Sequence, residues 1–163
     1  MLAGCALRPA SAPAPSAPGI PEQSPAAKNP GWSAMDYAAL LVANATAMLG
    51  QPYRYGGSAP GGFDCSGLVA YAAAGAGINL PRTAHEQLRA GTLVRRSGLR
   101  AGDLVFMHLA GKELHVGIAI DGVHFIHAPA TGGRVRIDSL AAPPYATGFI
   151  GARRVVDTEG PVK

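Results

Sequence analysis

The sequence predicts an α+β fold in which a few helices pack against one antiparallel sheet of about five to six strands. Two observations carry this prediction. A glycine-rich loop over residues 56–62 changes abruptly into an apolar, alanine-rich stretch over residues 68–74, which is typical of a helix start. Farther along, two alternating apolar runs meet at Asp121-Gly122, a dipeptide typical of β-hairpins.

Composition divides the chain of 163 residues into three parts. Residues 1–33 are dominated by Ala, Pro and Ser, and so few large apolar groups predict an extended linker. Residues 34–157 form the predicted domain, and residues 158–163 form a short polar tail. No apolar run approaches the roughly 20 residues of a membrane-spanning helix.

The charge pattern argues against nucleic acid as a partner. The formal net charge is +4, but the basic residues are scattered rather than aligned on one helix with aromatic residues between them. A basic surface of this kind suits an acidic polymer such as a cell wall.

The first predicted helix covers residues 34–49. Ser33 is a good N-cap with Asp36 in the first turn, and Gly50 ends the helix ahead of a proline. Its inward face is predicted from residues at helical spacing, and we interpret this face as core packing. These residues are Tyr37, Leu40, Leu41, Ala45 and Met48.

The remaining elements follow from turn and capping signals. Thr83 and Glu86 have capping-box spacing, which predicts a short helix over residues 84–90. Predicted strands cover residues 93–94, 103–108, 134–137 and 149–156, in addition to the hairpin.

Cys65 is a candidate nucleophile because of its place at the start of a helix. Asp64 is positioned to cap the first turn, and the free N–H groups there stabilise a thiolate. We therefore expect a lowered pKa for Cys65. The alternative is a small, buried and inert side chain, which the flanking polar and glycine residues disfavour.

A thiol nucleophile needs a base and a group that orients the base, and His115 and His127 are the candidates. A three-residue loop over 120–122, with Gly122 in the left-handed conformation, places His115 opposite His127 on one face. Gly117 and Ala119 then share that face, which leaves room for the cysteine helix. By the same alternation His124 points away, as a surface residue.

Several blocks of the sequence together resemble the NlpC family of papain-like cell-wall cysteine peptidases. The resemblance covers roughly residues 34–156 and keeps the family's block order. The blocks are residues 51–57 (QPYRYGG), 63–69 (FDCSGLV), 80–83 (LPRT), 101–106 (AGDLVF), 115–118 (HVGI) and 125–128 (FIHA).

This resemblance implies a papain-like fold and a role for each matching residue. Cys65 is then the nucleophile, His115 the general base and His127 the residue that holds the ring of His115. Tyr53 would bind substrate or stabilise the oxyanion. Asp64, Ser66 and Arg82 match positions that line the groove.

The implied substrate is the stem peptide of peptidoglycan, cut between D-γ-glutamyl and a diamino acid or between D-Ala and diaminopimelate. The Asp64 carboxylate and nearby hydroxyls suit a free amine on that substrate. No cofactor or metal is implied, and we expect a monomer.

Residues 2–5 (Leu-Ala-Gly-Cys) resemble the lipobox of bacterial lipoproteins. This implies a lipid anchor on Cys5 and a periplasmic, outer-membrane-anchored protein of the cell envelope. The charged and apolar regions of a signal peptide do not precede this cysteine, so the pattern indicates either a longer precursor or a chance match. The linker that follows favours the first.

Two other functions use the same residues. A zinc hydrolase could bind its metal through Cys65, His115 and His127. Cysteine and its acidic and hydroxyl neighbours at a helix start suit a nucleophile better. A non-catalytic wall-binding module is the second alternative, and the presence of all three polar residues argues against it.

Overall fold

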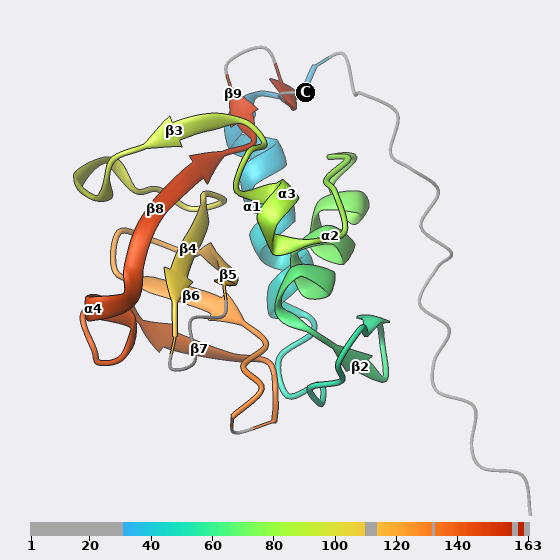
Figure 1. The fold of residues 1–163 in the computed structure, drawn as a ribbon. Helices are drawn as coiled ribbons and strands as arrows, with labels where there is room; N and C mark the ends of the chain where they lie inside the picture. Colours follow the sequence, from blue (N-terminus) through green and yellow to red (C-terminus); the bar gives the residue numbers. More distant parts are fainter. Residues whose placement is uncertain (1–30, 110–113, 132, 158–159, 162–163) are drawn as a thin grey trace, which may run out of the picture.

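A six-stranded antiparallel sheet forms one side of the protein, and helices α1, α2 and α3 lie along the other (Figure 1). The computed structural model describes residues 31–109, 114–131, 133–157 and 160–161. The α+β prediction is confirmed. In sheet order the strands are β3 (Thr92–Val94), β8 (Phe149–Arg154), β4 (Leu104–His108), β5 (Leu114–Ala119), β6 (His124–His127) and β7 (Arg136–Ser139).

The helices begin where the sequence predicted, but the first and the third end earlier than predicted. They are α1 (Ala34–Thr46), α2 (Cys65–Gly75) and α3 (Ala84–Gln87). From Met48 the N–H groups bond three residues back, as in Met48 N to Ala45 O at 3.0 Å. The same change follows Gln87, where Ala90 N bonds Gln87 O at 3.1 Å. Such tight turns satisfy the last helical carbonyls, so the predicted ends at 49 and 90 extended too far.

Capping side chains fix the start of each of these helices. Ser33 and Asp36 form a complete capping box on α1, and Thr83 and Glu86 form another on α3. Each satisfies two otherwise free N–H groups, and losing such a cap costs about 1 kcal/mol.

Shorter elements complete the chain between these helices and strands. They are the paired strands β1 (Ser58–Ala59) and β2 (Gly62–Phe63), the 3-10 helix at Arg96–Gly98, helix α4 (Tyr145–Gly148), and the paired strands β9 (Val156–Asp157) and β10 (Gly160–Pro161).

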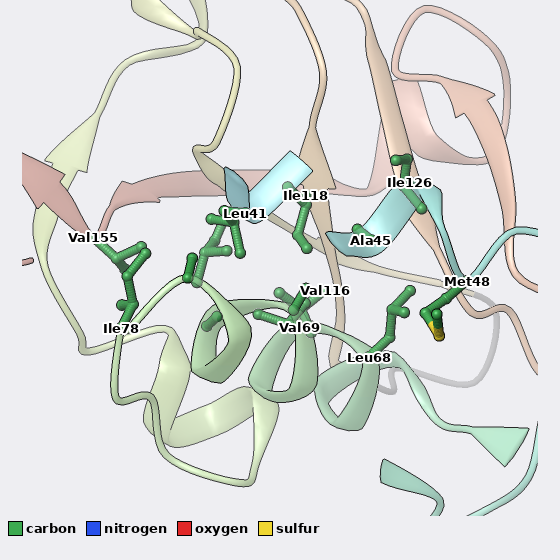
Figure 2. Close-up of a cluster of buried hydrophobic side chains, with 14 of the residues drawn as sticks. Leu41, Ala45, Met48, Leu68, Val69, Ile78, Val116, Ile118, Ile126 and Val155 are labelled. Atoms are coloured by element: carbon green, nitrogen blue, oxygen red, sulfur yellow. The ribbon is translucent and has the colours of Figure 1, made fainter. Parts of the chain in front are cut away.

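The two faces of the sheet carry separate apolar clusters. On the face covered by α1 and α2, side chains of Val116, Ile118 and Ile126 meet those of Leu41 and Leu68 (Figure 2). The predicted stripe on α1 packs here, with Leu40 only partly buried. The opposite face holds a smaller cluster whose members include Val105, Met107, Ala119, Phe125, Leu140 and Tyr145.

The predicted packing face of the cysteine helix was wrong. Helix α2 packs against Val116 and Ile118, not against the face of Gly117 and Ala119. On β5 the side chains of Val116 and Ile118 bury more apolar surface under this helix than Gly117 and Ala119 could. Gly117 instead makes room within the sheet, since a Cβ atom there would lie 2.6 Å from Cδ2 of Phe125.

The hairpin register also differs from the prediction, by two residues. Ile118 pairs with Ile126 and Ala119 with Phe125, so the loop covers residues 121–123. Asp121 builds this loop, because its Oδ1 accepts the N–H groups of Val123 and His124, both at 2.6 Å. A shift of two residues preserves the face of every side chain, so the prediction that both histidines share a face survives.

Residues 1–30, which include Cys5 and most of the predicted linker, and most of the predicted tail lie outside the described residues. Within the described part of the chain, no helix combines the length and the apolar character needed to cross a membrane.

Candidate active site

Cys65 is the first residue of α2, and Asp64 caps that helix as predicted. The Asp64 Oδ1 atom accepts the N–H of Gly67 at 2.7 Å. Gly67 is needed at this point because a Cβ atom there would overlap the carbonyl oxygen of Gly57. The glycine-rich loop therefore lies directly against the first turn of the helix and fixes the position of the thiol.

The two predicted histidines are brought together on neighbouring strands. His115 on β5 and His127 on β6 are both buried, and Nε2 of His115 lies 2.7 Å from Nδ1 of His127. Their rings meet edge to face, with centroids 5.0 Å apart. One nitrogen of His115, Nδ1, remains for another partner.

Cys65, His115 and Tyr53 line one cavity of about 390 Å³. The structure thus places the predicted nucleophile, base and tyrosine around the same space. The other lining residues are Leu109, Leu114, Pro129, Ala130, Thr131, Arg136, Pro144 and Tyr145.

The predicted lowering of the Cys65 pKa was wrong. Burial raises the pKa of the Cys65 thiol above its usual value, and the negative charge of Asp64 adds to the rise. Backbone hydrogen bonds from Val116, Ser66 and Cys65 itself act in the opposite direction but are outweighed. The free-energy cost of removing a thiolate from water is larger here than its stabilisation by the N–H groups at the helix start.

Both imidazoles are neutral at pH 7. Burial, together with a smaller effect of the neighbouring His127, lowers the pKa of His115 to about 3. Burial also lowers the pKa of His127 to about 4, against the opposing effect of Asp138. With the thiol pKa raised, the resting site contains a neutral thiol and a neutral base.

These pKa values predict that stability falls as the pH is lowered from 6.5 to 5. In the unfolded chain the imidazoles bind protons with a pKa of about 6.5, whereas in the folded protein they bind them only near 3 and 4. The unfolded state therefore binds more protons in this window, which destabilises the fold. Thermal unfolding followed by circular dichroism at pH 6.5 and 5 measures the effect.

The matched control is the double variant His115→Gln, His127→Gln. The thermal unfolding midpoint of this variant should vary less between pH 6.5 and 5 than that of the parent protein. An unfolding midpoint of the parent that does not change between pH 6.5 and 5 would contradict the neutral, buried pair.

A carboxylate that the sequence analysis missed completes the hydrogen-bonded chain. Asp138 on β7 lies with its Oδ2 atom 2.8 Å from Nε2 of His127. The same oxygen accepts Nε of Arg136 and the hydroxyl of Tyr145, each at 2.8 Å. The signal available in the sequence was the spacing of two between Arg136 and Asp138, but the strand predicted over residues 134–137 ended one residue before Asp138, whereas β7 covers Arg136–Ser139.

Asp64, Ser66 and Arg82 also lie close together, and their side chains contact mainly one another. Arg82 forms an ion pair with Asp64 at 2.6 Å and donates to Ser66 Oγ at 3.0 Å. Asp64 also accepts the N–H groups of Gly56 and Gly67. A substrate amine would have to compete with Arg82 for this carboxylate, so the geometry favours a role in fixing the loop and helix start.

The zinc alternative conflicts with the directions of the ring nitrogens. A zinc ion would need His115 and His127 each to point a nitrogen at the metal, at about 2.0–2.1 Å. Instead Nε2 of His115 and Nδ1 of His127 point at each other. In the described part of the chain, no cluster of three or more His, Cys, Asp or Glu side chains could hold a metal ion.

A cysteine at the start of a helix, beside two linked imidazoles on an antiparallel sheet, defines a papain-like α+β domain. Comparison with known proteins assigns it further. The chain belongs to the NlpC/P60 family, which matches residues 50–154.

Relatives and solved structures agree with this assignment. The chain is 44% identical over 117 residues to the Escherichia coli (strain K12) protein named Probable endopeptidase YafL, covering 68% of this chain and 47% of that protein. It is 45% identical over 114 residues to Murein DD-endopeptidase MepH of the same organism, covering 66% and 42%. The chain thus spans less than half the length of these two relatives.

Among solved structures, the peptidoglycan hydrolase RipB from Mycobacterium tuberculosis superposes with a TM-score of 0.66 at 28% identity. The match covers 76% of this chain and 67% of RipB.

Proposed function

We propose that this domain is a cysteine peptidase that hydrolyses amide bonds in the stem peptides of peptidoglycan. The observation that carries the proposal is that His115 lines the same cavity as Cys65 and is hydrogen-bonded to His127 behind it. The names of MepH and RipB, a murein endopeptidase and a peptidoglycan hydrolase, support the choice of substrate.

The reaction begins with a neutral thiol and a neutral imidazole. As the Cys65 sulfur attacks the amide carbonyl, its proton passes to the free Nδ1 of His115. The carbonyl oxygen becomes negative and is stabilised by N–H groups at the start of α2 and by the Tyr53 hydroxyl. His115 then protonates the leaving amine, and a thioester to Cys65 remains.

Water then hydrolyses the thioester, and His115 again acts first as a base and then as an acid. His115 removes a proton from water, the hydroxide attacks the thioester, and the Cys65 sulfur leaves and regains its proton. Because thiol and base start neutral, charge develops only during the reaction. His127 stabilises the protonated ring of His115 by accepting its Nε2–H at 2.7 Å.

Digestion of purified sacculi, followed by mass spectrometry of the products, tests this function and assigns the bond. A cut between D-Ala and diaminopimelate divides cross-linked muropeptides into monomers, with the gain of one water for each bond. A cut between D-γ-glutamyl and the diamino acid shortens the stem itself. Sacculi that release neither product would contradict the proposal.

Activity lost to iodoacetamide but not to a chelator would distinguish a thiol mechanism from the zinc alternative.

We also infer that Cys5 carries a lipid anchor that holds the protein at the outer membrane, facing the periplasm. The lipobox resemblance of residues 2–5 and the linker composition after them support this placement. Cell-wall hydrolases among the relatives agree with a location in the cell envelope. Incorporation of a labelled fatty acid into the parent protein, and its loss in Cys5→Ser, would support the anchor. Equal labelling of the two would refute it.

A further inference from the structure

The hydrogen bonds around Asp138 determine which ring nitrogens carry protons. An ionised carboxylate can only accept, so at 2.8 Å from Asp138 the Nε2 of His127 must be the donor. A neutral imidazole has one N–H, which leaves Nδ1 of His127 as an acceptor. That atom lies 2.7 Å from Nε2 of His115, which must therefore donate. Nδ1 of His115 is then left without a proton.

We propose that Asp138 is a positioning residue that fixes the tautomers of both imidazoles, so that His115 presents an unprotonated Nδ1 for the Cys65 thiol. Without the carboxylate, His127 could equally carry its proton on Nδ1 and donate to His115. His115 would then carry its proton on Nδ1 and could not accept one from sulfur. The carboxylate thus selects the one arrangement in which the base is competent.

Arg136 and Tyr145 keep Asp138 ionised and fixed in place. Both donate to its Oδ2 atom at 2.8 Å, and Arg136 also donates to the Tyr145 hydroxyl at 3.3 Å. Burial alone would raise the pKa of Asp138, but the hydrogen bonds from Arg136, Tyr145 and His127 hold it below its usual value. The ring of Tyr145 also packs edge to face against His127, with centroids 5.3 Å apart.

The nuclear magnetic resonance test depends on neither activity nor a variant. In protein labelled with ¹⁵N-histidine, long-range ¹⁵N–¹H correlations separate protonated from unprotonated ring nitrogens. At pH 7 we expect both His115 and His127 as the Nε2–H tautomer. Finding either ring mainly as the Nδ1–H tautomer would overturn the proposal, whether or not the protein proves to be a peptidase.

The kinetic test rests on the proposed function and compares two substitutions. Asp138→Leu removes the acceptor and should lower kcat about tenfold to a hundredfold, the usual effect of losing an outer partner of a functional histidine. Asp138→Asn keeps a weaker acceptor, so its kcat should lie between that of Asp138→Leu and that of the parent protein. KM should change little, because Asp138 acts through His127 and not on the substrate.

Asp121→Asn is the matched control, since Asp121 bonds the ring of His124 at 2.9 Å on the exposed side of the same hairpin. We expect parental kcat for this variant. Parental kcat in both Asp138 variants would overturn the positioning role. An inactive parent protein with the expected tautomers would instead contradict the peptidase function and leave the tautomer assignment standing.

Discussion

Replacing Cys65 with alanine is expected to lower kcat by about four orders of magnitude or more, which leaves no measurable turnover of muropeptides. The sulfur is the atom that forms the thioester, and no neighbouring group can replace it. Ser66 is buried, and its hydroxyl is held by Arg82 at 3.0 Å. Steady-state hydrolysis of a soluble cross-linked muropeptide, with products followed by mass spectrometry, measures the loss.

The fold should survive this change, so the loss can be assigned to chemistry. Alanine is a good helix former, and the cap from Asp64 to Gly67 does not involve the Cys65 side chain. Circular dichroism and the unfolding midpoint serve as the control. A folded Cys65→Ala protein that retains more than about one-tenth of the parental kcat would exclude a covalent mechanism through this residue.

Local signals predicted the start of the site correctly. Asp64 follows a glycine-rich loop and precedes alanine-rich residues, and this contrast placed Cys65 at a helix terminus. Alternation in the hairpin placed His115 and His127 on one face. This result is unchanged when the strand pairing shifts by an even number of residues. Both are properties of short segments, which is why the sequence sufficed.

The misplaced features depend on interactions between segments. The pKa of Cys65 follows from how deeply α2 is buried against β5, and burial outweighs the helix terminus. The hairpin loop was misplaced because the side chain of Asp121, not a left-handed Gly122, organises the turn. Neither property can be read from spacing along the chain.

Asp138 was missed because its distance from His127 depends on how β6 pairs with β7. In the sheet, His127 pairs with Arg136 and Phe125 pairs with Asp138. The connection between these strands is not a two- or three-residue turn, so turn chemistry does not set the register. The sequence showed the alternation of Arg136 and Asp138 but not which histidine they would meet.

Substitution of His115 is expected to have a far larger effect than substitution of His127, although the two rings are in contact. His115→Gln removes the group that takes and returns the proton, and kcat should fall by about a hundredfold to ten-thousandfold. His127→Gln keeps an amide oxygen that can accept from Nε2 of His115. Its kcat should therefore fall by about tenfold to a hundredfold, as for other partners that orient a functional histidine.

His127→Phe provides the sharper comparison, since it fills the same space between Phe125 and Tyr145 without offering an acceptor. It should be less active than His127→Gln yet more active than His115→Gln, with similar KM values throughout. The rate of Cys65 alkylation by iodoacetamide should follow the same order, because it reports deprotonation of the thiol without any substrate. If kcat and the alkylation rate of His115→Gln both equal or exceed those of His127→Gln, His115 is not the base. The proton must then leave the sulfur by another route.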